Sequence, residues 1–374
     1  MTQEPQLETS PSGRLSPGPE GGSGLDPYIA GLPKAELHVH HVGSASPQIV
    51  AELAARHEGS TPVPADEQLL ASYFTFTDFA HFIEVYLSVV DLIRTPEDIW
   101  TLTHGVARDL AAQSVRYAEL TLTPYSSIAR GIAAQDYCDA IEDARERAAR
   151  DFGIQLRWSF DIPGEAGLPS ADVTLDVALR NRPAGLISFG LGGPEIGVPR
   201  PQFEPYFTAA RAAGLHSVPH AGESTGPESI WDSLRYLGAE RIGHGIAAAG
   251  DPALMDYLIE HDIPLEVCPT SNVCTRSVPS LAEHPLPALV AAGVPVTINS
   301  DDPPMFSTTL NQEYSVAAQL LGLDAAGVTN LARAAVRYSF LDQPGQQSLL
   351  KEIDQYEVDA ATDRRSDTSV GGSS

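Results

Sequence analysis

The chain has 374 residues, 43% of them hydrophobic, which is enough for one large domain or two ordinary ones. Its 23 basic and 49 acidic residues give a formal net charge of −26. This charge argues against DNA or RNA as a partner, because a phosphate backbone is bound by a basic surface. No apolar run reaches the roughly 18 residues of a membrane-spanning helix, the N-terminus has no signal-peptide pattern, and three cysteines form no disulfide framework. We therefore expect a soluble, cytoplasmic protein.

Both ends of the chain differ in composition from the part between them. Residues 1–26 are rich in Pro, Gly, Ser and Glu and have almost no apolar residues, and residues 363–374 are similar. Such segments bury too little apolar surface to fold. We predict a single domain over residues 27–362, flanked by two disordered tails.

Within this domain, short apolar runs alternate with helical patterns. Strands are expected at residues 35–41, 115–122, 154–162, 185–191, 215–220, 241–245, 263–268 and 294–300. Helices are expected between them, at residues 134–151, 201–213, 227–237, 252–261 and 285–292. Eight strands separated by helices predict a parallel (β/α)8 TIM-type barrel. An open doubly wound sheet is the alternative, although no GxGxxG follows the first strand.

Two segments add helices to this pattern, residues 44–114 after the first strand and residues 311–360 at the C-terminus. The first contains the run 73–79, YFTFTDF, which is unusually aromatic for an insertion. Core packing explains such a run. The alternative is a hydrophobic wall over the barrel mouth, in which Phe76 and Phe79 contact a substrate.

Polar clusters fall at the carboxyl ends of the predicted strands. His38 and His40 end the first strand and share one face, because side chains of a strand alternate. An HxH pair alone is equally typical of structural histidines bonded to backbone. However, His220 ends the fifth strand, His244 ends the sixth, and Asp301 follows the eighth. In a barrel these ends converge on the mouth where active sites lie.

Imidazole nitrogens and a carboxylate form a ligand set typical of zinc, and the same donors also suit Fe2+, Co2+ or Mn2+. The predicted ligands are His38, His40, His220 and Asp301. A water bound to such a metal is acidified toward a pKa of about 7. Glu223, three residues after His220, is placed to transfer a proton. His244 is a candidate for holding or deprotonating the water.

The motifs HVH, HAGE, GHG and NSDDP, in this order, resemble the adenosine deaminase family of the metal-dependent amidohydrolase superfamily. The stretches LPKAELHVH and CPTSNV are also similar to that family, and the resemblance covers residues 32–340. It implies a hydrolytic deaminase of 6-aminopurine nucleosides that holds one Zn2+ per chain with the four ligands above. It also implies that Glu223 protonates purine N1 and that His244 handles the attacking water. Asp302 would bond N7, and the backbone N–H of Gly193 would meet N3.

Val42 departs from the family pattern HxHLDG, in which an acidic residue two positions after the second histidine bonds the 5′-hydroxyl of the sugar. A valine accepts no hydrogen bond, and a buried, unpaired hydroxyl costs roughly 1–3 kcal/mol. We therefore expect a substrate without a free 5′-hydroxyl. One branch of the family deaminates 6-aminodeoxyfutalosine, an intermediate of the futalosine route to menaquinone. We rank this substrate above adenosine, which is the alternative, and above adenine. Arg130, with Ser126 and Ser127 nearby, is the predicted partner of its carboxylate.

Three other classes of protein compete with this interpretation. A binuclear hydrolase of the same superfamily needs a carboxylated lysine near the middle of the barrel, but the chain has only Lys34 and Lys351. A cytidine-deaminase-like fold needs HxE and PCxxC motifs, and the chain contains no CxxC. A catalytically silent binding protein on a retained barrel is the third. Metal analysis and an ammonia-release assay distinguish it from an enzyme.

Overall fold

The computed structural model describes residues 24–74 and 79–370. Its eight strands are all parallel and lie in chain order around one sheet. They are β1 (Lys34–His40), β2 (Val115–Leu122), β3 (Gln155–Pro163), β4 (Leu186–Gly192), β5 (His216–Ala221), β6 (Ile242–His244), β7 (Leu265–Val267) and β8 (Val296–Ile298).

The sheet closes on itself where the chain after β8 meets β1. Val39 and Asp301 form a parallel bridge. The N–H of His40 donates to the carbonyl of Asp301 over 2.8 Å, and the N–H of Asp301 donates to the carbonyl of His38 over 3.0 Å. These bonds remove the two free edges of the sheet. The predicted (β/α)8 barrel is therefore confirmed, and the open doubly wound sheet is excluded.

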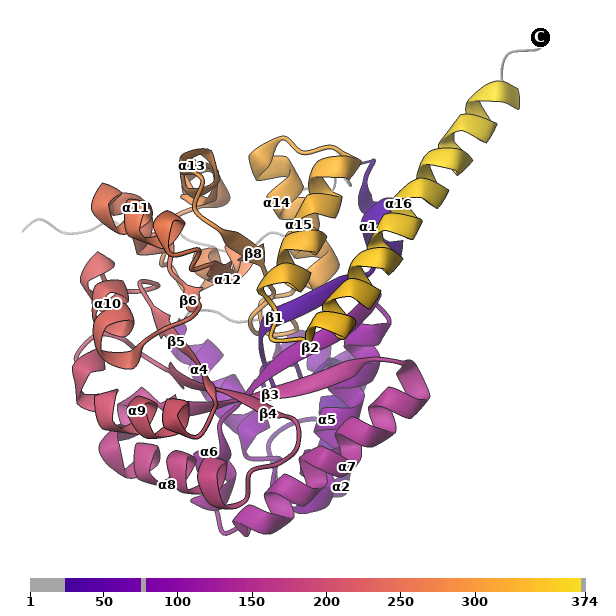
Figure 1. Ribbon diagram of the computed structural model, residues 1–374. Helices are drawn as coiled ribbons and strands as arrows, with labels where there is room; N and C mark the ends of the chain where they lie inside the picture. The colour runs from indigo at the N-terminus through magenta and orange to yellow at the C-terminus, as the bar shows by residue number, and fades with distance from the viewer. Residues whose placement is uncertain (1–23, 75–78, 371–374) are drawn as a thin grey trace, which may run out of the picture.

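Helices surround the barrel (Figure 1). Those that follow strands β2 to β7 are α6 (Pro124–Ile128), α7 (Ala134–Phe152), α8 (Gly167–Arg180), α9 (Glu204–Ala212), α10 (Pro227–Asp232), α11 (Pro252–Glu260), α12 (Pro269–Cys274) and α13 (Leu286–Ala292). Fully buried aromatic side chains of the strands pack against them: Phe160 meets Tyr137 of α7, and Phe189 meets Phe207 of α9. Burial of each such side chain contributes roughly 1.5–3 kcal/mol. The main core thus lies between the strands and the helices.

In its described residues, the predicted insertion after β1 forms the helices α2 (Pro47–Arg56), α3 (Glu67–Tyr73), α4 (Phe79–Val90) and α5 (Pro96–Ala111). Thr95 and Asp98 form a capping box at the start of α5. The buried carboxylate of Asp98 also accepts hydrogen bonds from Arg56 over 2.8 Å and His57 over 3.0 Å, which tie α5 to the end of α2. Phe76 and the side chain of Phe79 lie outside the described residues, so their place over the mouth stays a prediction.

The C-terminal helices are α14 (Leu310–Leu321), α15 (Ala325–Tyr338) and α16 (Gln343–Val370), and a short N-terminal helix, α1 (Asp26–Gly31), lies beside α16 (Figure 1). Tyr356 of α16 packs its ring against Tyr28 of α1, with centroids 5.1 Å apart, and donates to the Tyr28 carbonyl. The last turns of α16 project away from the barrel. Helix α1 begins one residue before the predicted domain of residues 27–362, and α16 continues to residue 370. The predicted domain limits stay a prediction.

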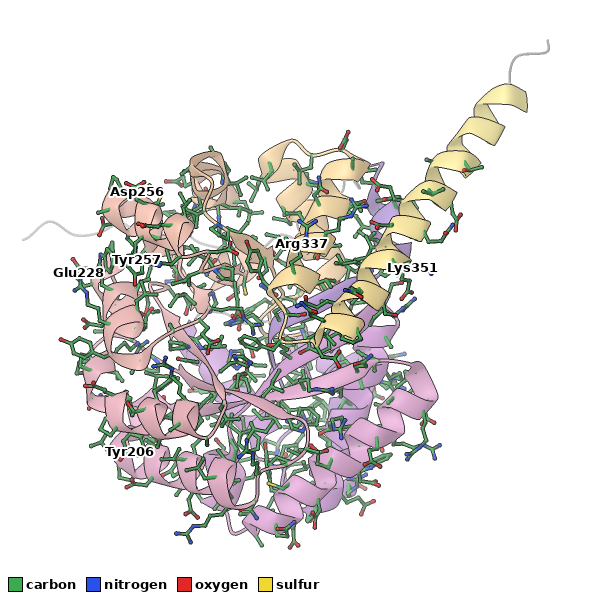
Figure 2. All side chains as sticks on the ribbon, in the orientation of Figure 1. Tyr206, Glu228, Asp256, Tyr257, Arg337 and Lys351 are labelled. Atoms are coloured by element: carbon green, nitrogen blue, oxygen red, sulfur yellow. The ribbon has the colours of Figure 1, made fainter. Side chains whose placement is uncertain are left out.

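Neither lysine belongs to the barrel mouth. Lys34 is buried at the opposite end of β1, where its Nζ donates to the carbonyls of Ile29 and Leu32, over 2.7 Å each. Lys351 lies on α16 at the periphery, as Tyr206 does on α9 (Figure 2). Among the described helices, none combines the length and apolar character needed to cross a bilayer.

Candidate active site

The carboxyl ends of the strands bring the predicted metal ligands together. One donor atom from each of His38, His220, His244 and Asp301 lies within 4.8 Å of the others. The Nε2 atom of His40 adjoins this group, 3.1 Å from Nε2 of His220 and 3.2 Å from Oδ1 of Asp301. The structure thus gathers all four predicted ligands in one cluster and places His244 beside them.

The backbone around the cluster is locally unusual. His244 and Asp301 have φ values of 59° and 64°, a left-handed conformation that residues other than glycine seldom adopt. Strained residues of this kind concentrate at functional sites. Gly243, the middle residue of β6, leaves room for two imidazole rings. A Cβ there would lie 2.8 Å from Cε1 of His38 and 3.2 Å from the ring of His220.

A buried network of charges forms the floor beneath the cluster. The Nδ1 atom of His38 lies 2.8 Å from Oε2 of Glu266, whose other oxygen accepts a bond of 2.6 Å from Arg241. Arg241 also pairs with Glu119. Burial disfavours the charged form of Glu266, but the charge of Arg241 and the bond from His38 outweigh it and lower the pKa of Glu266. An ionised Glu266 takes the N–H of His38 Nδ1, so the lone pair of His38 lies on Nε2.

The cluster fits a metal ion. Nε2 of His38 is buried and has no hydrogen-bond partner among the described residues. Burial, together with the neighbouring His38 and His40, holds the pKa of His220 well below its usual value, which keeps its imidazole in the neutral form that binds metals. Burial opposes ionisation of Asp301, but the adjacent imidazoles of His38 and His40 lower its pKa. Imidazoles and one carboxylate, without thiolate, are the donors of a catalytic zinc site.

A chain of hydrogen bonds sets the tautomer of His244. The N–H of Leu286 donates to Nδ1 of His284, so His284, whose pKa burial lowers to about 4, carries its proton on Nε2. That proton goes to Oδ1 of Asn272 over 3.2 Å, and the Asn272 amide donates to Nδ1 of His244 over 3.1 Å. His244 therefore presents an N–H at Nε2, which lies 3.9 Å from Oδ2 of Asp301.

Glu223 lies beside His244 at the edge of the cluster. Its Oε2 atom is 3.7 Å from Nε2 of His244, and its Oε1 accepts a hydrogen bond of 2.9 Å from the hydroxyl of Thr275. The Glu223 side chain is 20% exposed, so it faces both the cluster and the open mouth. A carboxyl group at this position can exchange a proton with a molecule bound over the cluster.

Three of the predicted substrate contacts lie at the same end of the barrel as the cluster. Gly193 follows β4 with φ of 76°, and a Cβ there would lie 2.2 Å from Oε2 of Glu165. Burial and the neighbouring Asp301 raise the pKa of Asp302 to about 7, and its Oδ1 has no hydrogen-bond partner among the described residues. The loop that carries the half-buried Val42 rests on Asp302, since a Cβ at Gly43 would lie 1.5 Å from its Oδ1.

Arg130 is engaged elsewhere. Its guanidinium donates to the carbonyl of Val90 over 3.3 Å and lies 3.2 Å from the carboxylate of Asp91, so it ties the end of α4 to the loop after α6. Its side chain is 35% exposed. A role in binding a substrate carboxylate would require Arg130 to leave or share Asp91, and this role stays a prediction, as do the contacts of Phe76 and Phe79.

Comparison with known proteins agrees with this geometry. The family model described as adenosine deaminase matches residues 33–356. The chain belongs to the adenosine deaminase family. It is 66% identical over 337 residues to the aminodeoxyfutalosine deaminase of Streptomyces avermitilis, covering 90% of this chain and 94% of that protein. The protein of the same name from Streptomyces coelicolor is 66% identical over 334 residues, covering 89% of this chain and 86% of that protein.

Solved structures of the family share the fold. The adenine deaminase of Arthrobacter aurescens superposes with a TM-score of 0.81 at 31% identity, over 87% of this chain and 99% of that one. The family predicted from HVH, HAGE, GHG and NSDDP is thus confirmed, and so is a hydrolytic deaminase as its class.

Sequence reasoning assigned no role to several residues that support the site. Glu266 holds His38, Asn272 orients His244, and Thr275 holds Glu223. Glu266 carried a usable signal, since it is a lone acid inside the apolar strand predicted at 263–268. Asn272 lies in the CPTSNV stretch that resembles the family.

Proposed function

We propose that this chain is a zinc-dependent deaminase that hydrolyses 6-aminodeoxyfutalosine to futalosine and ammonia, a step of menaquinone biosynthesis. The observation that carries the reaction type is the position of Glu223, whose Oε2 lies 3.7 Å from Nε2 of His244 at the edge of the histidine–aspartate cluster. The substrate is supported by Val42 and by the names of relatives that are 66% identical. We further propose a cytoplasmic enzyme whose partner is its small-molecule substrate.

We assign the metal to His38, His40, His220 and Asp301, and we leave His244 free for the reaction because its Nε2 carries a proton. A bound zinc ion would supply an acidified water at neutral pH. Fe2+, Co2+ or Mn2+ could be held by the same donors. Glu266 and the hydroxyl of Ser271, 2.6 Å from Oδ2 of Asp301, would orient two of these ligands from behind.

The protein residues then perform acid catalysis and orientation. Glu223, held by Thr275, donates a proton to N1 of the purine, which makes C6 electron-poor. Water adds to C6 through its oxygen and returns one proton to the Glu223 carboxylate, while the Nε2–H of His244 donates to the oxygen on which charge develops. The remaining hydroxyl proton passes to the amino group as the C6–N bond breaks, so ammonia leaves and a 6-oxopurine remains. In this neutral tautomer, His244 holds the oxygen rather than removing its proton.

We propose that Asp302 and Gly193 orient the base through N7 and N3, and that the apolar Val42 faces the 5′ substituent. The test is kcat/KM, by ammonia release, for 6-aminodeoxyfutalosine, 5′-deoxyadenosine, methylthioadenosine, adenosine and adenine, with metal content measured on the same preparation. We expect one divalent metal per chain and the highest kcat/KM for 6-aminodeoxyfutalosine. A tenfold or greater preference for adenosine would contradict the proposed substrate. If the zinc-loaded protein released no ammonia from any of these compounds, the proposal that it is a deaminase would be wrong.

A further inference from the structure

The loop that follows β5 turns sharply around one carboxylate. The backbone N–H groups of Gly222, Glu223 and Ser224 each donate to Glu195 over 2.8 Å, and the hydroxyl of Thr225 donates over 2.7 Å. Successive N–H groups that converge in this way form an anion-binding concavity. Here the anion is a side chain of the protein itself, supplied by the loop after β4.

The Glu195 carboxylate is fixed in charge as well as in place. Its side chain is 2% exposed, and Nη2 of Arg200 lies 3.6 Å from its Oε2. Burial opposes ionisation, but hydrogen bonds from Thr225 and Ser224, together with the charge of Arg200, lower the pKa of Glu195 to about 2. At neutral pH Glu195 therefore remains an anion and exchanges no proton with a substrate.

Arg200 extends the hold on this loop to its first residue. Its Nη2 donates to the carbonyl of His220 over 3.0 Å, and its side chain is 1% exposed. Arg200 thus binds the first residue of the segment from His220 to Glu223, and Glu195 binds the last. One end carries a proposed metal ligand and the other carries the proposed proton donor.

The backbone between these two ends is restricted by close packing and by hydrogen bonds. Gly222 has φ of 68°, and a Cβ there would lie 2.5 Å from Cδ1 of Ile230 and 3.2 Å from the methyl group of Ala247. The backbone N–H of Glu223 is bound by Glu195, while its Oε1 is bound by Thr275. A rotation of the peptide at Glu223 would therefore carry its carboxyl group away from the cluster.

We propose that Glu195, supported by Arg200, is a positioning residue that holds Glu223 in reach of purine N1; this inference rests on the proposed function. A glutamine at this position offers one acceptor oxygen where four donors converge, and its NH2 group would face an N–H. The loop must then rearrange. A misplacement of about 1 Å in a reacting group costs roughly 10²-fold in rate.

The test compares Glu195→Gln with Asp98→Asn. Asp98 is a matched control, because it is also a buried carboxylate that lies beside an arginine and accepts from backbone N–H groups. It lies among the inserted helices. For Glu195→Gln we expect kcat to fall by about 10²-fold, with KM and metal content close to wild type. Asp98→Asn should lower Tm and leave kcat unchanged.

Inhibitor binding separates positioning from a general loss of structure. One probe is a substrate analogue with a tetrahedral hydroxyl-bearing C6 and an N–H at position 1, which bonds Glu223. The other is the 1-deaza analogue, which carries C–H at position 1. Glu195→Gln should weaken the first in proportion to its loss in kcat/KM and the second far less. Should Glu195→Gln not fold, Glu195→Asp, which keeps the charge but withdraws it by one methylene, gives the same comparison with a smaller loss.

Wild-type kcat in both Glu195 variants would overturn the positioning role, and so would equal weakening of the two inhibitors or an equal loss of kcat in Asp98→Asn. If the wild-type protein itself releases no ammonia from any 6-aminopurine nucleoside, the proposed function fails and this inference fails with it. Those two results are distinguishable because the wild type is measured first.

Discussion

Glu266 accepts a hydrogen bond from Nδ1 of His38 over 2.8 Å, at a depth where neither side chain is more than 2% exposed. Glu266 is anchored in turn by Arg241. The floor of the barrel therefore determines which nitrogen of His38 is free, before any ligand arrives. Carboxylates that orient metal-binding histidines in this way raise the basicity of the ligand and its affinity for the metal.

Removal of this charge should weaken the metal site without removing a ligand. For Glu266→Gln we expect metal affinity to fall by about 10- to 100-fold, measured by titration against a competing chelator. Glu142→Gln is the control, because Glu142 accepts hydrogen bonds from Trp158 and Gly185 outside the barrel. Wild-type affinity in Glu266→Gln would show that the bond does not tune the site.

Loss of a proposed ligand should remove metal and activity together. In His38→Ala or Asp301→Ala, one donor of the cluster is lost and a buried partner is left unpaired. We expect less than one metal per chain after dialysis and no measurable ammonia release. A variant that turns over normally without metal would contradict the assignment of these ligands.

Glu223→Gln should separate catalysis from metal binding. The amide cannot deliver a proton to N1, and general acid catalysis contributes roughly 10²–10⁴-fold. We expect wild-type metal content and a fall in kcat of that size. Glu240→Gln serves as the control, since Glu240 bonds His216 at the opposite end of β5. Near-normal turnover in Glu223→Gln would remove this residue from the mechanism.

Most of the barrel could be predicted from apolar runs bounded by glycine. The strand predicted at 115–122 matches β2, whereas those predicted at 241–245 and 294–300 are longer than β6 and β8. Strand β6 ends at His244 because this residue has a left-handed backbone, with φ of 59°, and the hydrogen-bond ladder of a strand cannot continue past it. A hydrophobic pattern carries no information about such a residue, because φ here follows from the surrounding packing.

The site was predictable as far as its motifs reached. Strand ends converge in a barrel, so His38, His220 and Asp301 could be grouped from order alone. Arg130 could not be placed in this way, because its partner Asp91 follows the inserted helix α4, whose packing no periodic pattern describes. Glu195 was visible in the sequence only as the residue after Gly193-Pro194. Its role depends on four donors that come together in three dimensions.

Acid should remove the stability that Glu195 contributes. Its pKa is about 2 in the folded chain against a usual value of 4.5, so its contribution is complete above pH 4.5 and is lost as pH falls toward 2. A shift of this size corresponds to about 3 kcal/mol. In urea unfolding of chelator-treated protein, the difference between wild type and Glu195→Gln should shrink over that interval. If the difference in unfolding free energy between the two proteins stayed constant from pH 6 to pH 3, these contacts would not lower the pKa of Glu195.

The substrate preference should follow the side chain at position 42. Val42 is half-buried beside Gly43, whose backbone touches Asp302, so this loop borders the space next to the proposed N7 contact. A carboxylate at position 42 would accept a bond from a 5′-hydroxyl and would be desolvated beside an apolar 5′ substituent. Both effects act in the same direction, and each is worth roughly 1–3 kcal/mol.

Val42→Asp should therefore change the ratio of kcat/KM for adenosine to that for 6-aminodeoxyfutalosine by roughly tenfold or more in favour of adenosine. Val42→Leu keeps an apolar side chain without an acceptor, so it should retain the wild-type preference and shows the effect of size alone. Metal content is measured in each variant, because position 42 lies two residues from the proposed ligand His40. An unchanged ratio in Val42→Asp, with metal bound, would mean that the 5′ substituent is read by other residues, and the inserted helices would then be the segment to mutate.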